Sequence, residues 1–291
     1  MAIYNLGSIN IDMVYRVPRL PAPGETLAAY EHLKGLGGKG ANMSVAAARA
    51  AARVHHIGAV GREGAWAVER LMEYGVDTRS IDTAAAPTGH AIIAVDDHGE
   101  NSIILYHGAN HTITEYQITK ALQNASSADS MVLQNETNAQ VLAASRAKAL
   151  GMKVIYAAAP FDAQAVADVA QHVDLLVLNE VEAHQLEEAT GRPVAQMGIE
   201  DVVVTLGADG CRHINVSTGK ITQYDAVPVT PVDTTGAGDT FTGYLAAGLD
   251  RGMSMAQAIH LATVAGAIMV TRLGTADVIP DLKDIEDFKL G

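Results

Sequence analysis

A glycine-rich string just ahead of a strong helical pattern is the feature of this sequence best suited to chemistry. Residues 233–241 read Asp-Thr-Thr-Gly-Ala-Gly-Asp-Thr-Phe. A turn made of Gly236, Ala237 and Gly238 would aim backbone N–H groups at one point, at the positive end of the following helix. The string therefore predicts an anion hole that stabilises the charge on a phosphoryl group during its transfer.

Asp239 falls in the first turn of that helix, beside the predicted anion hole. A carboxylate there can accept the proton of a hydroxyl group as its oxygen attacks phosphorus, so Asp239 is the candidate general base. Thr234 and Thr235 are candidate N-caps of the helix. The alternative is a glycine-rich helix start whose aspartate only stabilises the helix dipole, but the complete string favours the catalytic interpretation.

A second glycine-rich segment, residues 35–42, also precedes a helical pattern. It is not a Walker A loop, because neither Ser nor Thr follows Lys39 and the glycine spacing differs. Adjacent glycines, Gly38 among them, permit a close approach of the backbone to a ligand. Lys39 and Asn42 would lie on one face of the helix as hydrogen-bond donors. We expect this segment to bind hydroxyl groups; a flexible loop is the alternative for the segment taken alone.

Asn10 and Asp12 follow the first predicted strand. In open α/β sheets, ligands bind beyond the carboxyl ends of the strands. The two polar side chains alternate with Ile9 and Ile11, so both point to the same side of the chain. An amide and a carboxylate placed in this way can hold adjacent hydroxyl groups of a sugar. Capping of a turn is the alternative role.

Two further segments could contact a nucleotide. Asn179 and Glu182 join a buried strand to a helix, and their spacing lets them meet a hydrated Mg²⁺ and the nucleotide phosphates from one side. Glu182 could equally be an ordinary acidic residue of a first helical turn. Residues 204–210 end a strand in a glycine-rich turn where a nucleotide could lie, although such turns are common.

The elements that must position these residues alternate along the chain between short apolar strands and longer helical patterns. This alternation predicts a parallel sheet covered by helices on both faces. Strands are expected at residues 3–6, 54–57, 131–133, 153–156, 175–178 and 202–206. Helices are expected at residues 41–52, 63–74, 138–150, 163–171, 181–189, 237–249 and 255–271.

Two stretches, at about residues 11–35 and 89–106, interrupt this alternation. The first is rich in proline and then turns β-like at residues 26–33, and the second reads as a hairpin. We expect the two stretches to pair as a small sheet that acts as a lid over a cleft; two surface excursions are the alternative. No repeat or linker divides the chain, so a single domain over residues 1–291 is predicted.

The composition of the 291 residues is that of an ordinary folded enzyme, with 48% hydrophobic and 18% charged residues. A formal net charge of −13 argues against nucleic acid or an anionic membrane as a partner. Cys211 is the only cysteine, which excludes an intramolecular disulfide and a cysteine-based zinc site. The sequence shows neither a signal peptide nor an apolar run of membrane-spanning length, so we expect a soluble, cytoplasmic protein.

Residues 37–42 and 233–243 resemble the two signatures of the PfkB family of carbohydrate kinases. Together with residues 7–12, 23–26 and 204–207, they are similar to the ribokinase branch of that family, and the resemblance runs from residue 1 to about 280. It implies a three-layer αβα fold with a mostly parallel central sheet and a small β lid. It also implies ATP-dependent phosphorylation of the primary alcohol of a sugar, and a homodimer formed through the lids.

The resemblance also implies roles for individual residues. Asp239 would be the base, beside the anion hole of Gly236, Ala237 and Gly238. The sugar would be held by Asn10, Asp12, Gly38, Lys39, Asn42 and Glu136. ATP would meet Asn179, Thr205 and Gly207, with Glu182 near Mg²⁺ through water. A monovalent cation such as K⁺ would be held by Asp233, Thr235 and residues 270–275.

Tyr244 and Asp277 are positions at which the sequence departs from the family pattern. Tyr244 stands where the second signature usually has a small residue, which could reshape the edge of the pocket. Asp277-Val278 replaces a typical Pro-Ser near the cation loop and so removes a possible hydroxyl ligand. The second departure bears on the K⁺ site more than on kinase activity.

The leading hypothesis is that ATP phosphorylates ribose to give ribose 5-phosphate. A nucleoside or another sugar is the rival substrate for the same chemistry. A nucleoside would need apolar or aromatic walls around its base, and aromatic residues make up only 4% of the chain. A sugar- or nucleotide-binding protein without catalysis is the alternative of a different class. Asp239 beside an intact glycine turn argues against it, because binding alone needs no base.

Overall fold

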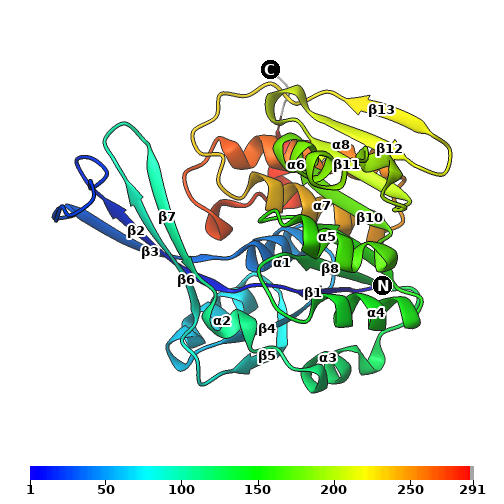
Figure 1. Cartoon of the computed structure of the whole chain (residues 1–291), viewed down its shortest axis with the longest axis horizontal. Helices are drawn as coiled ribbons and strands as arrows, with labels where there is room; N and C mark the ends of the chain where they lie inside the picture. Colours follow the sequence, from blue (N-terminus) through cyan, green and yellow to red (C-terminus); the bar gives the residue numbers. More distant parts are fainter. Residues whose placement is uncertain (289–291) are drawn as a thin grey trace.

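The computed structural model describes residues 1–288, which form a nine-stranded sheet with helices on both faces and a separate four-stranded sheet (Figure 1). Residues 289–291 of the expected single domain lie outside the described residues. The arrangement confirms the three-layer α/β fold with a mostly parallel central sheet. In the described part of the chain, no helix is both long and apolar enough to cross a membrane.

The central sheet is parallel from β5 to β11 and ends in two antiparallel strands, β12 and β13. Every strand expected from an apolar run is present. The additional strands β5, β12 and β13 are polar and lie toward the edges of the sheet, where one face or edge meets solvent. In order across the sheet, the strands are β13 (Lys220–Tyr224), β12 (Cys211–Asn215), β11 (Asp201–Thr205), β10 (Leu175–Asn179), β9 (Lys153–Ala157), β8 (Ser130–Gln134), β1 (Ile3–Leu6), β4 (Val54–Val60) and β5 (Asp77–Thr83).

The central strands are apolar on both sides because each face of the sheet packs against helices. Along β1, Ile3 belongs to the core shared with α1, α2, α7 and α8, whereas Tyr4 and Leu6 belong to the core shared with α3, α4, α5 and α6. Because successive side chains of a strand point to opposite faces of the sheet, one strand contributes residues to both cores. The helices are α1 (Lys39–Arg49), α2 (Ala65–Glu73), α3 (Glu115–Ala121), α4 (Gln140–Ala149), α5 (Ala163–Val169), α6 (Glu180–Thr190), α7 (Ala237–Asp250), α8 (Met255–Val270) and α9 (Leu282–Asp287).

The two stretches that interrupt the strand–helix alternation meet in the four-stranded sheet. Figure 1 shows this sheet extending away from the central sheet, on the left of the view. Its strands, in order, are β3 (Glu31–Gly37), β2 (Asn10–Arg16), β6 (Gly89–Val95) and β7 (Asn101–Tyr106). The strand expected at residues 26–33 instead occupies Glu31–Gly37, because β3 begins where it can pair with the end of β2, at Arg16 opposite Glu31.

Helices α1 and α7 approach each other closely behind the central sheet. A β-carbon added at Gly243 of α7 would lie 2.5 Å from Ala46 Cβ and 2.6 Å from Met43 O of α1. Only a residue without a side chain fits there. One helical turn nearer the amino ends, Asn42 Nδ2 donates to Asp239 Oδ2 at 2.9 Å. The helix contact therefore decides the distance between these two candidate active-site residues.

We expect Gly243→Ala to lower the free energy of unfolding by about 1–3 kcal/mol, because the added methyl group must push α7 away from α1. Denaturant titration of the wild type and the variant measures this difference. Gly266→Ala in α8 is the matched control, since its β-carbon would have Ala237 O at 3.9 Å as its nearest neighbour. That variant should be neutral or stabilised by about 0.5–1 kcal/mol. Equal losses in both variants would contradict the packing argument.

Candidate active site

The predicted site residues lie at one edge of the central sheet. Because β1, β8, β10 and β11 are parallel, their carboxyl ends meet at the same edge, where open α/β sheets bind ligands. Asn10 and Asp12 follow β1, and Glu136 follows β8, its neighbour. Asn179 ends β10 and is paired with Thr205 at the end of β11. The order of strands thus separates the candidate sugar residues from the candidate nucleotide residues.

The start of α1 is tied directly to the end of β1. A β-carbon at Gly40 would overlap Gly7 Cα, so the two backbones are in contact and only glycine fits at both positions. Ser8 O accepts a hydrogen bond from Ala41 N at 2.9 Å, and Ser8 Oγ accepts one from Gly40 N at 3.1 Å. These bonds use N–H groups at the helix start, which need partners outside the helix.

Glu136 is joined to the same two segments. Its Oε2 accepts hydrogen bonds from Ser8 Oγ at 2.5 Å and from Lys39 N at 3.1 Å, and the side chain is buried. Ser8 lies within residues 7–12, but the sequence predicted no role for it. Its hydroxyl group is the link between β1, α1 and Glu136.

Asn10 and Asp12 lie on the same face of β2, as the alternation along the chain predicts. Asn10 is buried, and its Oδ1 accepts from Asn110 Nδ2 at 2.8 Å. Asn110 also accepts from Ile9 N at 2.9 Å, so it orients the strand start. Nothing in the local sequence signals this contact, because Asn110 is about a hundred residues away in the chain. The Asp12 carboxylate lies directly over Gly37, where any β-carbon would overlap it.

Asp239 faces the start of α1. Its Oδ2 accepts from Asn42 Nδ2 at 2.9 Å, and its Oδ1 lies 4.0 Å from Lys39 Nζ. The prediction that Lys39 and Asn42 share a helical face is confirmed by these contacts to one carboxylate. Asp239 is 6% exposed, yet it lies at the amino end of α7 and at the edge of the sheet. The arrangement brings the candidate base Asp239 next to the side-chain donors of Asn42 and Lys39.

The start of α7 differs from the expectation that Thr234 or Thr235 caps it. The N-cap is Gly236 at φ +75°, in the left-handed region, and among residues 1–288 no side chain caps the helix. Glycine adopts this backbone conformation without steric cost. Ala237 N donates to Thr234 O at 3.2 Å. Among residues 1–288, the N–H groups of Gly238 and Asp239 have no hydrogen-bond acceptor and can bind an anion, as the predicted hole requires.

Asn179 and Glu182 form a capping box at the start of α6. Asn179 Oδ1 accepts from Glu182 N, and Glu182 Oε2 accepts from Asn179 N, each at 2.8 Å. The structural role that the sequence left open for Glu182 is thus present. Burial raises the pKa of Glu182, and the hydrogen bond from Asn179 N, followed by the charge of Lys39, opposes this shift. Gly207, at φ +59°, starts the turn after β11 and borders open space.

Asp233 links the turn before α7 to the loop after α8. Its Oδ1 accepts from Thr235 N at 2.9 Å, and its Oδ2 accepts from Gly274 N at 3.2 Å. Both segments predicted to hold a monovalent cation therefore meet at one carboxylate, which is a hard oxygen donor. The carboxylate of Asp277 does not join them; it accepts from Arg70 and Tyr74 instead.

Three carboxylates, those of Asp12, Glu136 and Asp239, share the site with the ammonium group of Lys39. Burial, with added repulsion from Glu136 and Asp239, raises the pKa of Asp12 to about 7. The charge of Asp239, followed by that of Glu136, raises the pKa of Lys39. A hydroxyl-rich ligand would donate hydrogen bonds to the carboxylates and so offset part of this unfavourable burial.

Known proteins share this fold and sequence over almost the whole chain. A family model described as pfkB family carbohydrate kinase matches residues 3–282. The ribokinase of Haemophilus influenzae is 37% identical over an alignment of 300 positions, gaps included, which covers 97% of this chain and 96% of that protein. The structure of a ribokinase from Thermotoga maritima superposes with a TM-score of 0.88 at 30% identity, covering 98% of each chain. An Arabidopsis thaliana ribokinase complexed with ribose and ATP gives a TM-score of 0.87 at 28% identity, covering 99% of this chain and 100% of that one.

The raised pKa of Asp12 predicts a pH dependence of stability. The folded protein holds the Asp12 proton up to about pH 7, whereas an unfolded aspartate loses it near 3.8, so the free energy of unfolding should fall as the pH rises between these values. Asp12→Asn removes this loss. Relative to wild type, the variant should gain stability from pH 5 to pH 8 by about 2.7 kcal/mol, because the pKa of Asp12 lies about two units above pH 5, at about 1.36 kcal/mol per unit.

Denaturant titrations at several pH values measure this difference. Asp82→Asn is the control, because Asp82 is an exposed residue of β5. The difference in the free energy of unfolding between Asp82→Asn and wild type should be the same at every pH. If Asp12→Asn raised the free energy of unfolding by the same amount at pH 5 and pH 8, the raised pKa of Asp12 would be contradicted.

Proposed function

The chain belongs to the PfkB family of carbohydrate kinases, and we propose that it transfers the γ-phosphoryl group of ATP to the primary hydroxyl group of ribose, giving ribose 5-phosphate and ADP. One observation carries the proposal most directly. The Asp239 carboxylate lies beside the uncapped start of α7 and faces Lys39 and Asn42 of α1. This arrangement supports the proposal, because phosphoryl transfer to an alcohol needs a base, an anion hole and hydroxyl-binding donors close together.

In this proposal Asp239 accepts the proton of the primary hydroxyl group while the hydroxyl oxygen forms a bond to the γ-phosphorus. The bond between that phosphorus and the bridging oxygen of ADP breaks in the same step, and ADP leaves. Gly236, Ala237 and Gly238 stabilise the negative charge through the amino end of α7. Asn42 and Lys39 hold the carboxylate in place. A fixed orientation of the reacting groups supplies a large part of such catalysis.

The remaining hydroxyl groups of the sugar would bind to the residues at the ends of β1 and β8. Carboxylates accept hydrogen bonds from hydroxyl groups, and amide side chains both accept and donate, so their mixture suits adjacent hydroxyls. Glycine at position 38, at φ +93°, lets the backbone approach the ligand. The proposed sugar ligands are Asn10, Asp12, Gly38, Lys39, Asn42 and Glu136.

The nucleotide would lie at the ends of β10 and β11, near Asn179, Thr205 and Gly207. Among residues 1–288, no group of three His, Cys, Asp or Glu side chains is arranged to hold a metal ion. This suits Mg²⁺, which keeps several waters and binds mainly to the phosphates of a substrate, and Glu182 could contribute through one such water. When bound, Mg²⁺ neutralises charge on the phosphates.

We include K⁺ in the proposal because the Asp233 carboxylate joins the Thr235 turn to the loop that contains Gly274. An ion bound there would add positive charge beside the anion hole. We also place the enzyme in the cytoplasm, which agrees with the single free and buried thiol of Cys211.

A substrate panel tests the proposed function. ATP turnover should be highest with ribose when it is measured against deoxyribose, fructose, adenosine and pseudouridine, with and without K⁺. Asp239→Asn should lower turnover by about 10²–10⁴-fold, the usual contribution of a general base, while ribose binding measured by calorimetry is retained. Absence of turnover with every polyol would refute the kinase proposal. Preference for a nucleoside would remove ribose and leave the mechanism in place.

We further propose that the four-stranded sheet closes over the sugar and that a second copy of the chain covers its apolar face. Val14, Leu33, Ile93 and Ile103 are directly paired across the four strands, so their side chains form one row on the face that carries Asn10 and Asp12. Leu33 is 47% exposed and Ile103 is 56% exposed. A contiguous apolar row of this kind is typical of an interface.

Ile103→Glu should convert the dimer to a monomer, because a charge in the apolar row would have to be buried without a partner. Light scattering coupled to size exclusion measures the mass directly. Ile104→Glu is the matched control: Ile104 is the next residue of β7, is 66% exposed and points to the opposite face. Dissociation by Ile104→Glu alone, or a wild type that is monomeric at every concentration, would overturn this interface.

A further inference from the structure

The segment Gly274–Pro280, between α8 and α9, contacts both halves of the candidate active site. Gly274 N donates to Asp233 Oδ2 at 3.2 Å, next to the turn that precedes α7. Thr275 Oγ1 donates to Leu36 O at 2.9 Å. Leu36 is buried near the end of β3, immediately before Gly37, Gly38 and Lys39. The segment is therefore a direct link from the phosphate side of the site to the sugar side.

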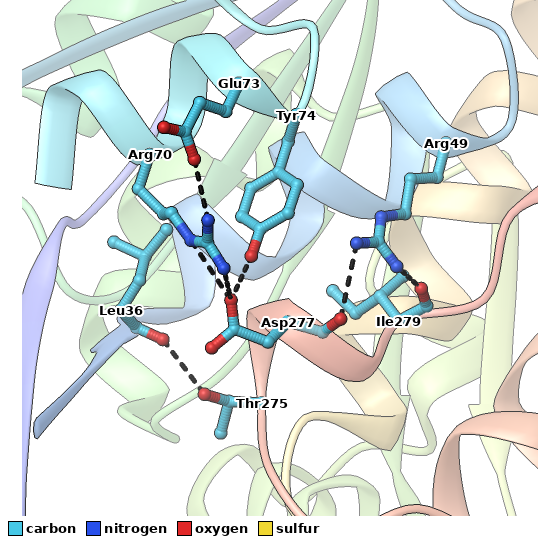
Figure 2. A network of polar contacts seen from close by, with 8 residues as sticks. All are labelled: Leu36, Arg49, Arg70, Glu73, Tyr74, Thr275, Asp277 and Ile279. Carbon is cyan, nitrogen blue, oxygen red and sulfur yellow. Dashed lines mark hydrogen bonds and ion pairs between the residues drawn. The ribbon is translucent and has the colours of Figure 1, made fainter. Parts of the chain in front are cut away.

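The carboxylate of Asp277 fastens this segment to α2 and to the residue that follows it. Asp277 Oδ1 accepts from Arg70 Nη2 at 2.8 Å, from Arg70 Nε at 3.2 Å and from Tyr74 Oη (Figure 2). Burial and the Asp277 carboxylate raise the pKa of Tyr74 to about 12, so its hydroxyl group keeps the proton that it donates. Arg70 Nη1 donates to Glu73 at 2.7 Å, which holds the guanidinium group from its other side.

The backbone carbonyl groups that follow are also bound by side chains. Arg49 of α1 donates to Asp277 O at 3.3 Å and to Ile279 O, as Figure 2 shows. Arg272 donates to Val278 O at 3.1 Å, and Tyr244 Oη donates to Pro280 O at 2.6 Å. Four consecutive carbonyl groups, 277 to 280, thus accept from side chains of other elements. Two residues of this network, Asp277 and Tyr244, stand at positions where the sequence departs from the family pattern.

The Arg70–Asp277 ion pair is too exposed for a contribution to stability to explain it alone. The side chains of Arg70 and Asp277 are 44% and 53% exposed, and exposed ion pairs contribute little to folding, about 0–1 kcal/mol. The geometry of the network is nevertheless specific, since Arg49 and Arg70 lie over the ring of Tyr74 at 4.9 and 5.0 Å and converge on one segment. Contacts with a specific geometry that add little to the stability of the fold are better explained by a role in positioning the segment Gly274–Pro280.

We propose that Asp277 is a positioning residue for the sugar side of the active site. By binding Arg70 and Tyr74, it holds the segment so that Thr275 stays bonded to Leu36 O, and this bond fixes the backbone that leads into Gly38 and Lys39. This proposal rests on the proposed function, in which the sugar binds beside Gly38 and Lys39. The proposed nucleotide residues at the ends of β10 and β11 lie outside the network. Loss of the network should therefore raise the KM for ribose and leave the KM for ATP unchanged.

The experiment compares Asp277→Ala with Asp277→Asn, which keeps an oxygen acceptor for Arg70 and Tyr74. In Asp277→Ala we expect the KM for ribose to rise about tenfold, equivalent to about 1.4 kcal/mol of binding, with the KM for ATP unchanged at constant KCl. Asp277→Asn should restore most of the loss. Thr275→Val, which removes only the donor to Leu36, should raise the KM for ribose similarly, and the double variant should be no worse than Asp277→Ala.

Glu73→Gln is the control, because it weakens the neighbouring contact of Arg70 and leaves Asp277 in place. It should leave both KM values unchanged. Equal rises in the KM values for ribose and ATP, additive effects in the double variant, or an unchanged KM for ribose in Asp277→Ala would each overturn the proposal.

Hydrogen exchange without any substrate separates this proposal from the proposed function. Peptides that cover residues 36–42 should exchange faster in Asp277→Ala than in wild type, while those over residues 175–182 should not change. This result would support the positioning role even if the substrate panel selected a sugar other than ribose. Identical exchange of residues 36–42 in the two proteins would refute the positioning role even if ribose were the substrate.

Discussion

The close approach of α1 and α7 is the constraint on which the candidate active site depends. Gly243 packs against the backbone and Ala46 of α1, and one turn away Asn42 donates to Asp239 at 2.9 Å. The proposed sugar-binding loop leads into α1 and the proposed anion-binding turn leads into α7, so this single helix contact fixes the two loops relative to each other. Phosphoryl transfer needs such fixation, because its catalysis consists mainly of positioning and electrostatic stabilisation.

The charges of the site follow from that proximity. Burial, followed by repulsion from Glu136 and Asp239, raises the pKa of Asp12 to about 7, and Lys39 supplies positive charge near these carboxylates. Such a set of acceptors is unfavourable in the absence of a ligand and favourable when hydroxyl groups donate to it. The electrostatics therefore support a neutral polyol as the phosphoryl acceptor, in agreement with the family to which the chain belongs.

Strand β3 connects the site to two parts of the molecule that are distant in sequence. Its last residues, Leu36 and Gly37, lie beside Thr275 and under the Asp12 carboxylate, respectively. The rest of the strand belongs to the four-stranded sheet that we propose to close over the sugar. A movement of that sheet would therefore bend the end of β3, which the Asp277 network holds from the opposite side, together with the chain at the ends of β2, β6 and β7.

Local patterns in the sequence determined the family, the central strands and the described helices other than α3 and α9, because apolar periodicity and glycine-rich turns act over a few residues. They also identified Asp239, Lys39 and Asn42, which the structure brings together. Other features depend on contacts that no local pattern encodes. Gly236 rather than a threonine caps α7, and β3 begins where it can pair with β2. Asn110 reaches Asn10, and Arg70 reaches Asp277, across about one hundred and two hundred residues. Only the tertiary structure decides such pairs, because the packing of distant elements sets their distance.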